Sequence, residues 1–359
     1  MRSFLRKQLL SITRRILLCD DGRDILCESL CGQAPPTQGL PDVSLLTESP
    51  YPDVSTKSEP AAGRPAVFIT GRFRSGSTLL WNVFRHISGC TAYYEPLNER
   101  CWFDAGARGQ HTDKTHKHVE DYWREYEGLA ELGQYYREDW ICRQLYMDER
   151  AWDPNLKRYI EILLARSAGL PVLQFNRVDF RLPWLRVHFP QAKIIHLYRH
   201  PRDQWLSTLY GDRFPTTSRI ADFQPFDRFY LLPWTRDLRR QFPFLNLSDS
   251  NHPYELFYLV WRLSYVFGRQ FADRSLSFES LVQDPESELS SVFSELGIQA
   301  SVNERILRLI ERPTLGKWTE YADDDWFARH ERRCDRLLAD FFSGVQPVNA
   351  PAENRIYSW

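Results

Sequence analysis

Residues 67–80 of this 359-residue chain read VFITGRFRSGSTLL, and this stretch decides the fold. A short apolar run over residues 66–69 has the length and β-branched content of a strand buried on both faces. Apolar residues then recur at helical spacing from Leu79 to Ile87. The turn between these segments is therefore expected to join a strand to a helix.

The turn has the character of a phosphate-binding loop. Gly71 and Gly76 bracket four residues, and glycine lets backbone N–H groups approach and wrap an anion. The N-terminus of the following helix adds free donors and partial positive charge. The nucleoside-triphosphatase pattern G-x-x-x-x-G-K-[ST] is broken at one place, because Ser77 stands where the lysine belongs and the cation has moved to Arg74.

A kinase or nucleoside triphosphatase is the rival interpretation of this loop. Such enzymes need the loop lysine and an acidic residue at a strand end to hold magnesium. Here the apolar strand expected at 193–198 is followed by Arg199. The loop is therefore interpreted as a site for a phosphate without a metal. Without further motifs, an ordinary glycine turn between strand and helix is the alternative.

The composition is typical of a soluble globular protein, with 26% charged and 43% apolar residues. The net charge of −1 gives no support for a nucleic-acid partner. Seven scattered cysteines argue against a disulfide framework and for a reducing compartment. Cys27 and Cys31 lack a second ligand pair, and His111, His116 and His118 fall in a polar stretch expected to be a solvated loop, so no metal site is predicted.

The N-terminal part, residues 1–64, is expected to be a basic amphipathic helix followed by a linker or arm. Residues 1–18 carry Leu5, Leu9, Ile12 and Ile16 at helical spacing, separated by arginines and a lysine. This helix would dock on the protein or make a peripheral contact with an anionic membrane. Its apolar run is too short and too interrupted for a transmembrane span or a signal peptide. The expected location is therefore cytoplasmic.

Polar side chains follow the other expected strands. Glu95 comes directly after a strand at 91–94, where the ends of parallel strands form a ligand-binding crevice. Residues 171–175 form a further strand that ends in polar groups, including Arg177. Arg199 ends the strand at 193–198, and Pro201 starts a helix that carries Ser207. A guanidinium and a hydroxyl in this arrangement suit a doubly charged group.

Strands that alternate with helices predict an α/β fold with a central parallel sheet. Residues 65–325 are expected to form the main domain, and residues 326–359 a tail that packs on it. A polar, aromatic and mostly helical insertion is expected at about 99–160, and a long loop at 211–253. A strand at 275–279 precedes a helix that begins after Asp284 and stops at Gly297. Residues 312–318 form a compact basic turn with an indole.

Taken together, these segments resemble the sulfotransferases that use 3′-phosphoadenylyl sulfate (PAPS). Residues 73–78 resemble the family's 5′-phosphosulfate loop, in the arginine form of carbohydrate and tyrosylprotein members. Residues 199–207 are similar to the 3′-phosphate site, residues 278–285 to the late strand–helix signature, and residues 316–318 weakly to the nucleotide-covering loop. The resemblance spans roughly residues 65–320 and implies a P-loop-like three-layer fold, with a central parallel sheet flanked by helices.

The resemblance also implies roles for individual residues. It implies PAPS as sulfate donor, no metal, and an acceptor that is a hydroxyl-bearing small molecule or glycan. Three residues are implied to be catalytic: Glu95 as general base, Arg74 and Arg177. The residues implied to bind the nucleotide are Arg72, Arg74, Ser75, Gly76, Ser77, Thr78, Arg199, Ser207, Lys317 and Trp318. The segment Glu95-Pro96-Leu97 favours a carbohydrate hydroxyl over a phenol, a lipid or a peptide tyrosine.

Two features depart from the family pattern. Many relatives have lysine followed by Thr or Asp and Pro where this chain has Arg177-Val178-Asp179. The Golgi-type membrane anchor of many relatives is not seen. A non-catalytic module that kept the fold is a further alternative, and the sequence gives no oligomeric state.

Overall fold

The computed structural model describes residues 65–211 and 214–344, and the account below concerns the compact unit that ends at Ala339. The expected basic helix at 1–18 and the linker or arm that follows it up to residue 64 lie outside the described residues. The same holds for the end of the expected C-terminal tail. Within the described ranges, no helix is long and apolar enough to cross a membrane.

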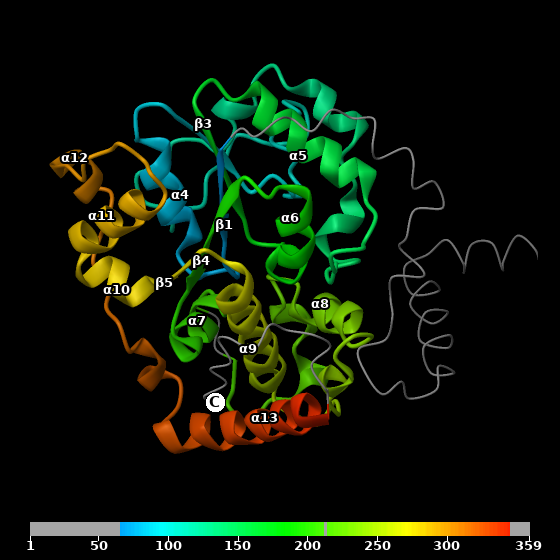
Figure 1. The fold of residues 1–359 in the computed structure, drawn as a ribbon. Coiled ribbons are helices and arrows are strands. Elements are labelled where there is room, and N and C mark those ends of the chain that lie inside the picture. Colours follow the sequence, from blue (N-terminus) through cyan, green and yellow to red (C-terminus); the bar gives the residue numbers. More distant parts are fainter. Residues whose placement is uncertain (1–64, 212–213, 345–359) are drawn as a thin grey trace, which may run out of the picture. The chain divides into compact units, whose positions relative to one another are not determined.

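Five parallel strands form the central sheet (Figure 1). They are β1 (Ala66–Thr70), β2 (Cys90–Tyr94), β3 (Leu170–Phe175), β4 (Ala192–Tyr198) and β5 (Arg274–Ser277). Their order is β2-β3-β1-β4-β5, and all four neighbouring pairs are parallel. In the register, Phe68 of β1 lies between Leu173 of β3 and Ile194 of β4. The predicted α/β fold with a central parallel sheet is confirmed.

The strand order places a ligand crevice between β1 and β4. The chain leaves β1 toward β2 on one side of the sheet, whereas it leaves β4 toward β5 on the other side. In open parallel sheets, such a reversal opens a crevice at the carboxyl ends of the two strands. The loop after β1 and the segment after β4 therefore meet there, although they lie more than a hundred residues apart in the sequence.

Helices flank this sheet (Figure 1). Helix α4 packs against β1, β2 and β3, and α9 packs against β4 and β5. In α4, Leu80, Trp81, Val83 and Phe84 are buried, and the Trp81 indole N–H donates to the Ala92 carbonyl of β2 at 2.9 Å. The α-helices of the described residues are α4 (Ser77–Arg85), α5 (Pro154–Arg166), α6 (Leu182–His188), α7 (Pro201–Thr208), α8 (Leu231–Leu238), α9 (Pro253–Phe271), α10 (Phe278–Gln283), α11 (Pro285–Glu295), α12 (Glu304–Leu307) and α13 (Asp324–Gly344).

The prediction of a mostly helical insertion at about 99–160 is wrong. Before α5 this segment contains only the 3₁₀ helices η2 (Arg124–Tyr126), η3 (Ala130–Gln134) and η4 (Glu138–Ile141). Its aromatic residues do not line a helix face; they pack into the core instead. The Tyr126 hydroxyl, for example, donates to the Tyr94 carbonyl at the end of β2. The many aromatic residues of this segment serve core packing, and their spacing in the sequence has no helical period.

Two smaller expectations also change. The expected loop at 211–253 contains α8, whose Leu231, Trp234 and Leu238 are buried, and the 3₁₀ helices η6 (Ile220–Asp222), η7 (Gln224–Phe226) and η8 (Pro243–Leu245). The strand expected to reach residue 279 ends at Ser277, because the Ser277 side chain caps α10 by accepting from the Ser280 amide. The predicted Asp284 cap of α11 is confirmed.

Candidate active site

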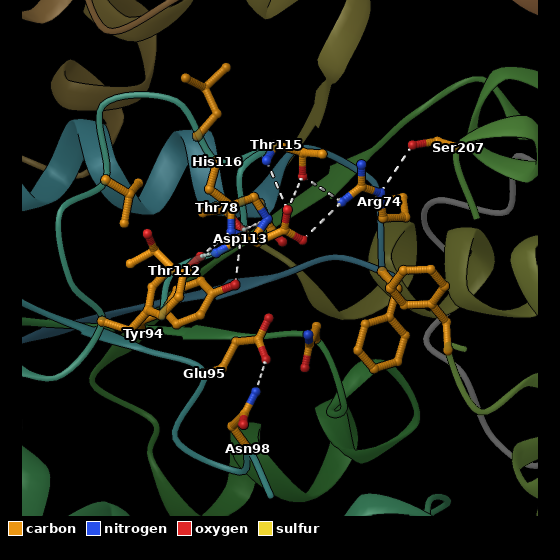
Figure 2. A pocket seen from close by; sticks show the side chains of 18 of the residues that line it. Arg74, Thr78, Tyr94, Glu95, Asn98, Thr112, Asp113, Thr115, His116 and Ser207 are labelled. Atoms are coloured by element: carbon orange, nitrogen blue, oxygen red, sulfur yellow. Dashed lines mark hydrogen bonds and ion pairs between the residues drawn. The ribbon is translucent and has the colours of Figure 1, made fainter. Parts of the chain in front are cut away.

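A cavity of about 680 Å³ lies at the carboxyl ends of the strands (Figure 2). Residues that follow all five strands line it, with Phe278 coming directly after β5. They include Phe73, Arg74, Gly76, Ser77 and Thr78 after β1, Glu95, Asn98 and Glu99 after β2, Asn176 and Arg177 after β3, and Arg199 and Ser207 after β4. The loop between β2 and α5 adds Asp113, Thr115, His116 and Tyr122. The topology therefore gathers most of the predicted site residues in one place.

Gly76 shapes the loop between β1 and α4. Its φ is +94°, which side chains rarely adopt, and a Cβ there would lie only 2.3 Å from the Phe278 ring. The first bonds of α4 run from the Leu79 and Leu80 amides to the Gly76 carbonyl. The amides of Ser77 and Thr78 therefore precede the hydrogen-bonded ladder, as at any helix N-terminus, and lie at the cavity.

Arg74 links this loop to α7. Its Nε donates to the Ser207 hydroxyl at 3.0 Å, and its Nη1 donates to the Thr115 hydroxyl at 3.1 Å. The Asp113 carboxylate lies 3.9 Å from Nη1. The guanidinium is thus directed toward Ser207, which the sequence assigned to a separate subsite. The loop and the segment after β4 form one continuous polar surface.

Arg199 lies beside Arg74, with Nη1 donating to the Arg74 carbonyl at 3.4 Å and the guanidinium 4.9 Å from the centre of the Phe278 ring. Burial lowers the pKa of Arg199 from its ordinary value, although Asp203 and Glu279 act in the opposite direction. Its Nε is buried without a hydrogen-bond partner among the described residues. A buried cationic donor without an acceptor is costly, and the guanidinium as a whole lies at the cavity, where it can attract an anion.

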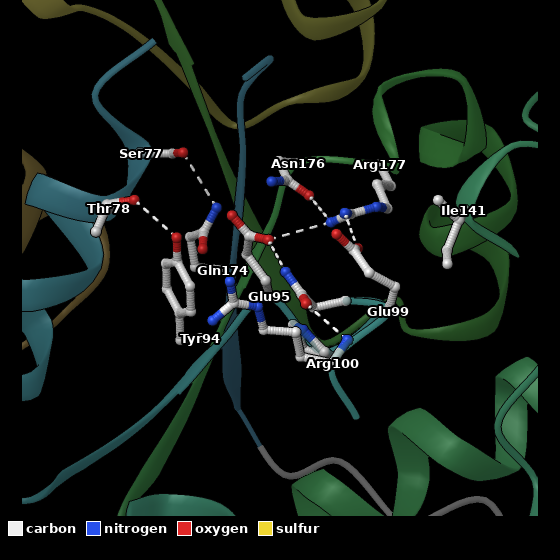
Figure 3. Close-up of polar contacts among 12 residues, drawn as sticks. Ser77, Thr78, Tyr94, Glu95, Glu99, Arg100, Ile141, Gln174, Asn176 and Arg177 are labelled. Carbon is white, nitrogen blue, oxygen red and sulfur yellow. Dashed lines mark hydrogen bonds and ion pairs between the residues drawn. The ribbon is translucent and has the colours of Figure 1, made fainter. Parts of the chain in front are cut away.

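Glu95 lies in a buried ionic cluster at the end of β2 (Figure 3). Its Oε2 accepts from Asn98 Nδ2 at 2.6 Å and from Arg177 Nη1 at 3.1 Å. Arg177 Nη2 donates to Glu99 Oε2 at 2.6 Å. Burial acts to lower the pKa of Arg177, but the two carboxylates outweigh it and hold that pKa above its ordinary value. Arg177 therefore stays charged and fixes Glu95.

A second polar cluster lies at the start of α4. The Thr78 hydroxyl is 3.2 Å from the Tyr94 hydroxyl and 3.4 Å from His116 Nε2. His116 Nδ1 is 2.6 Å from the Tyr122 hydroxyl, and the rings of Tyr94 and Tyr122 stack with centres 4.4 Å apart. Burial lowers the pKa of His116, which keeps the imidazole neutral near pH 7.

Four residues that the sequence assigned to the nucleotide do not line the cavity. Arg72 is buried over the Trp234 ring, and burial lowers its pKa to about 10. Ser75 is buried beneath the loop. Lys317 and Trp318 belong to a turn fastened to α7, because the Trp318 amide donates to the Asp203 carboxylate. Arg72 and Ser75 are thus buried within the loop, and the Trp318 turn is attached to α7, while a role of these four residues in nucleotide binding stays a prediction.

Sequence reasoning missed the contribution of the loop after β2. His116 was interpreted as part of a solvated loop, and Asp113, Thr115 and Tyr122 had no assigned role. No periodic pattern or spacing marks these four residues, since their placement depends on contacts with Thr78 and Arg74. In the described residues, no group of three or more His, Cys, Asp or Glu side chains could hold a metal ion.

The model of the sulfotransferase family matches residues 65–302, which is more than half of the chain. The chain belongs to the sulfotransferase family. The matched region contains the loop after β1, the Glu95–Arg177 pair and the segment from Arg199 to Ser207. The kinase or triphosphatase interpretation is therefore set aside, and the protein is a sulfotransferase. A comparison with curated proteins found no match.

Several solved structures resemble this sulfotransferase. The sulfotransferase domain of a Synechococcus olefin synthase is 18% identical, with 80% of this chain and 96% of that chain covered and a TM-score of 0.37. A mouse sulfotransferase complexed with PAP is 12% identical, with 77% and 83% covered and a TM-score of 0.38. A sulfotransferase from Mycobacterium avium is 12% identical, with 78% and 76% covered and a TM-score of 0.40.

Proposed function

We propose that this sulfotransferase transfers a sulfuryl group from PAPS to an acceptor hydroxyl, with a carbohydrate or glycoconjugate as the preferred acceptor. One observation carries the proposal. Arg74 contacts both Ser207 and Arg199 beside the N-terminus of α4, and these three residues share a cavity with the Glu95–Arg177 pair. An anion-binding end and a carboxylate that can accept a proton thus belong to one site.

The residues present fit the nucleotide. The Arg199 guanidinium and the Ser207 hydroxyl, which both line the cavity, supply donors for a 3′-phosphate. The amides of Ser77 and Thr78, with the Arg74 guanidinium, supply donors for the 5′-phosphosulfate. The left-handed backbone at Arg74 and Gly76 turns this loop around the cavity. PAPS differs from ATP in having anionic groups at both the 3′ and the 5′ positions. The two groups of donors therefore suit PAPS better than ATP.

The chemistry is an in-line displacement at sulfur. PAPS supplies the SO₃ group, and the electron pair of the broken S–O bond remains on the phosphate oxygen of the product, 3′-phosphoadenosine 5′-phosphate (PAP). Arg74 and the α4 amides stabilise the charge that develops on that oxygen. Glu95 takes the proton of the acceptor hydroxyl, whose oxygen forms the new S–O bond. The products are a sulfate ester and PAP, and Glu95 later releases its proton to water.

Arg177 orients Glu95 for this task. It holds Oε2 together with Asn98, and these are the two contacts of the carboxylate described above. Positioning a base in this way is a large part of its catalytic contribution, which is typically about 10²–10⁴-fold. The second carboxylate on Arg177, Glu99, is more exposed and balances the charge of the guanidinium.

The aromatic lining supports a sugar acceptor. Tyr210, Phe229 and Tyr230 line the cavity without being fully buried, and they offer flat apolar faces next to polar groups. Flat rings beside hydrogen-bonding side chains are suited to the alternating apolar faces and hydroxyls of a sugar. A phenol, a lipid hydroxyl and a peptide tyrosine are the competing acceptors, and a panel containing all four classes with radiolabelled PAPS tests this choice directly.

The nucleotide assignment is tested by binding. PAP should raise the melting temperature of the protein more than ADP or Mg-ATP does, because a ligand stabilises in proportion to the logarithm of saturation. The double variant Arg199→Ala/Ser207→Ala should lose affinity for PAP far more than for adenosine 5′-phosphosulfate, which has no 3′-phosphate. Equal losses for the two nucleotides would rule out the 3′-phosphate site.

A further inference from the structure

The hydrogen bonds around Tyr122 fix the proton of His116. The Tyr122 hydroxyl accepts from the Asp113 backbone amide at 2.9 Å and lies 2.6 Å from His116 Nδ1. Tyr122 is only 3% exposed, and burial raises the pKa of its phenol, so the hydroxyl keeps its proton. A buried hydroxyl needs an acceptor. Since an amide cannot accept, the Tyr122 proton is donated to His116 Nδ1.

This bond determines the tautomer of the imidazole. A neutral imidazole carries one proton, and Nδ1 is the acceptor, so the proton is on Nε2. The low pKa that burial gives His116 keeps the ring in this neutral form. Nε2 is also the nitrogen that faces Thr78 and the N-terminus of α4 (Figure 2). The ring therefore presents an N–H, and no lone pair, to the cavity.

The contact between Nε2 and Thr78 is weak and replaceable. At 3.4 Å it is long for a hydrogen bond, and Thr78 is also within 3.2 Å of the Tyr94 hydroxyl. A stronger acceptor, such as an anionic oxygen at the start of α4, would take the Nε2 proton more effectively. His116, Thr78 and Tyr94 are thus three uncharged donors gathered at the point where the loop and the helix face the cavity.

We infer that His116 is a catalytic residue that acts as a neutral hydrogen-bond donor, through Nε2, to the phosphosulfate group, and that Tyr122 is a positioning residue that fixes its tautomer. The inference rests on the proposed function. His116 forms and breaks no covalent bond and transfers no proton, since Glu95 receives the acceptor's proton. Its N–H stabilises negative charge on the oxygens of the sulfuryl group during transfer, in the manner of an oxyanion-hole donor.

A matched pair of variants tests this role. His116→Met keeps the side-chain length and removes the donor, whereas His116→Gln places an amide N–H near the position of Nε2. His116→Met should lower kcat about 100- to 1,000-fold, the usual effect of removing one such donor, while its affinity for PAP, which has no sulfuryl group, stays within about threefold of wild type. The kcat of His116→Gln should be at least about tenfold higher than that of His116→Met.

The controls separate this inference from a structural or basic role of His116. Both variants should unfold in one cooperative transition no more than about 10 °C below that of the wild type, because each loses the acceptor of the buried Tyr122 hydroxyl while the rest of the fold is unchanged. If His116→Gln is as slow as His116→Met with PAP binding preserved, or if both match the wild type, the donor role is wrong. If the wild type itself neither binds PAP nor transfers sulfate, the proposed function fails instead.

The tautomer has its own readout. Histidine-selective ¹⁵N labelling and long-range proton–nitrogen NMR distinguish the two neutral tautomers, and the His116 signal is assigned by its loss in His116→Gln. The wild type should show Nε2–H. Tyr122→Phe should produce a mixture of tautomers and a several-fold lower kcat with unchanged PAP affinity. A wild-type signal from Nδ1–H, or from a charged imidazolium at pH 7, overturns the inference.

Discussion

Two independent constraints act on Gly76. Its left-handed backbone disfavours any side chain, and the Phe278 ring occupies the space that a Cβ would need. The Phe278 ring also lies under Arg199, so the same ring supports the loop and the proposed 3′-phosphate site. At this scale the sequence alone was informative, because a glycine between a strand and an apolar helix has few other uses. It could not reveal Phe278, which comes 202 positions later.

Replacing Gly76 by alanine should therefore lower the free energy of unfolding more than the same replacement at a glycine whose only constraint is a positive φ. Gly89 is such a control, with a φ of +85° and open space around the position of a Cβ. Gly89→Ala should destabilise by about 1 kcal/mol. Gly76→Ala should destabilise more and should also weaken PAP binding, as measured by denaturant unfolding and titration. Equal effects of the two substitutions would contradict the steric role of Phe278.

Glu95 and Glu99 provide a second matched pair. Both carboxylates bond to Arg177, but only Glu95 is assigned the role of base. Glu95→Gln should lower kcat about 100- to 10,000-fold with little change in PAP affinity, because an amide cannot take the acceptor's proton. Glu99→Gln should cause a much smaller loss. A Glu95→Gln enzyme that turns over at the wild-type rate would show that the base is another group.

At the level of elements, strands and capped helices could be predicted from the sequence and the loops could not. The strand β1 could be predicted from its buried apolar run, and α11 from Asp284 and Pro285. The segment between β2 and α5 has no such signal, because its conformation depends on contacts with distant groups such as Thr78 and Arg74. Part of the site, including His116, therefore became visible only in three dimensions.

Helix α9 makes the stability of the fold depend on pH. His252 caps this helix by accepting a hydrogen bond from the Tyr254 amide. Burial lowers the pKa of His252 to about 4. Its polar neighbours are His330, Glu255 and Tyr321. In the unfolded chain His252 is protonated as the pH falls through about 6.5, whereas in the folded chain it is protonated only as the pH falls through about 4. This contribution is therefore complete above pH 6.5 and is lost as the pH falls toward 4.

The melting temperature should consequently decrease between pH 7.5 and 5. At pH 5 the loss from one such histidine approaches about 2 kcal/mol. His252→Asn keeps a capping acceptor but cannot titrate, so its melting temperature should depend less steeply on pH. The measurement is thermal unfolding across this pH range, and identical slopes for the two proteins would exclude His252 as a source of the dependence.

For the whole molecule, the net charge of −1 hides a strong local asymmetry. Six Arg or Lys residues line the cavity, against four Asp or Glu residues. The cations are Arg74, Arg100, Lys117, Arg177, Arg199 and Arg228, and the anions are Glu95, Glu99, Asp113 and Glu311. The net charge of the sequence was uninformative because folding creates the cationic surface that an anionic nucleotide would contact.

This asymmetry predicts a salt-dependent affinity for PAP. The dissociation constant should rise steeply between about 20 and 300 mM salt, because screening weakens attraction beyond about 10 Å. Lys117→Gln should reduce this dependence and leave the binding stoichiometry unchanged, since Lys117 is exposed at the cavity and contributes long-range charge. Titration calorimetry at several salt concentrations is the measurement, and an affinity independent of salt would argue against electrostatic attraction.

The carboxylate of Asp203 ties the region that matches the family to the part of the chain that follows it. The family match ends at residue 302, yet Asp203 in α7 accepts the amides of Gly316 and Trp318, and Arg202 pairs with Glu331 of α13. The helix that carries Ser207 is thus anchored from outside the matched region. A chain shortened to residue 302 should lose PAP binding, whereas one that ends at residue 344 should retain it, so the smallest unit expected to work on its own includes residues beyond the matched region.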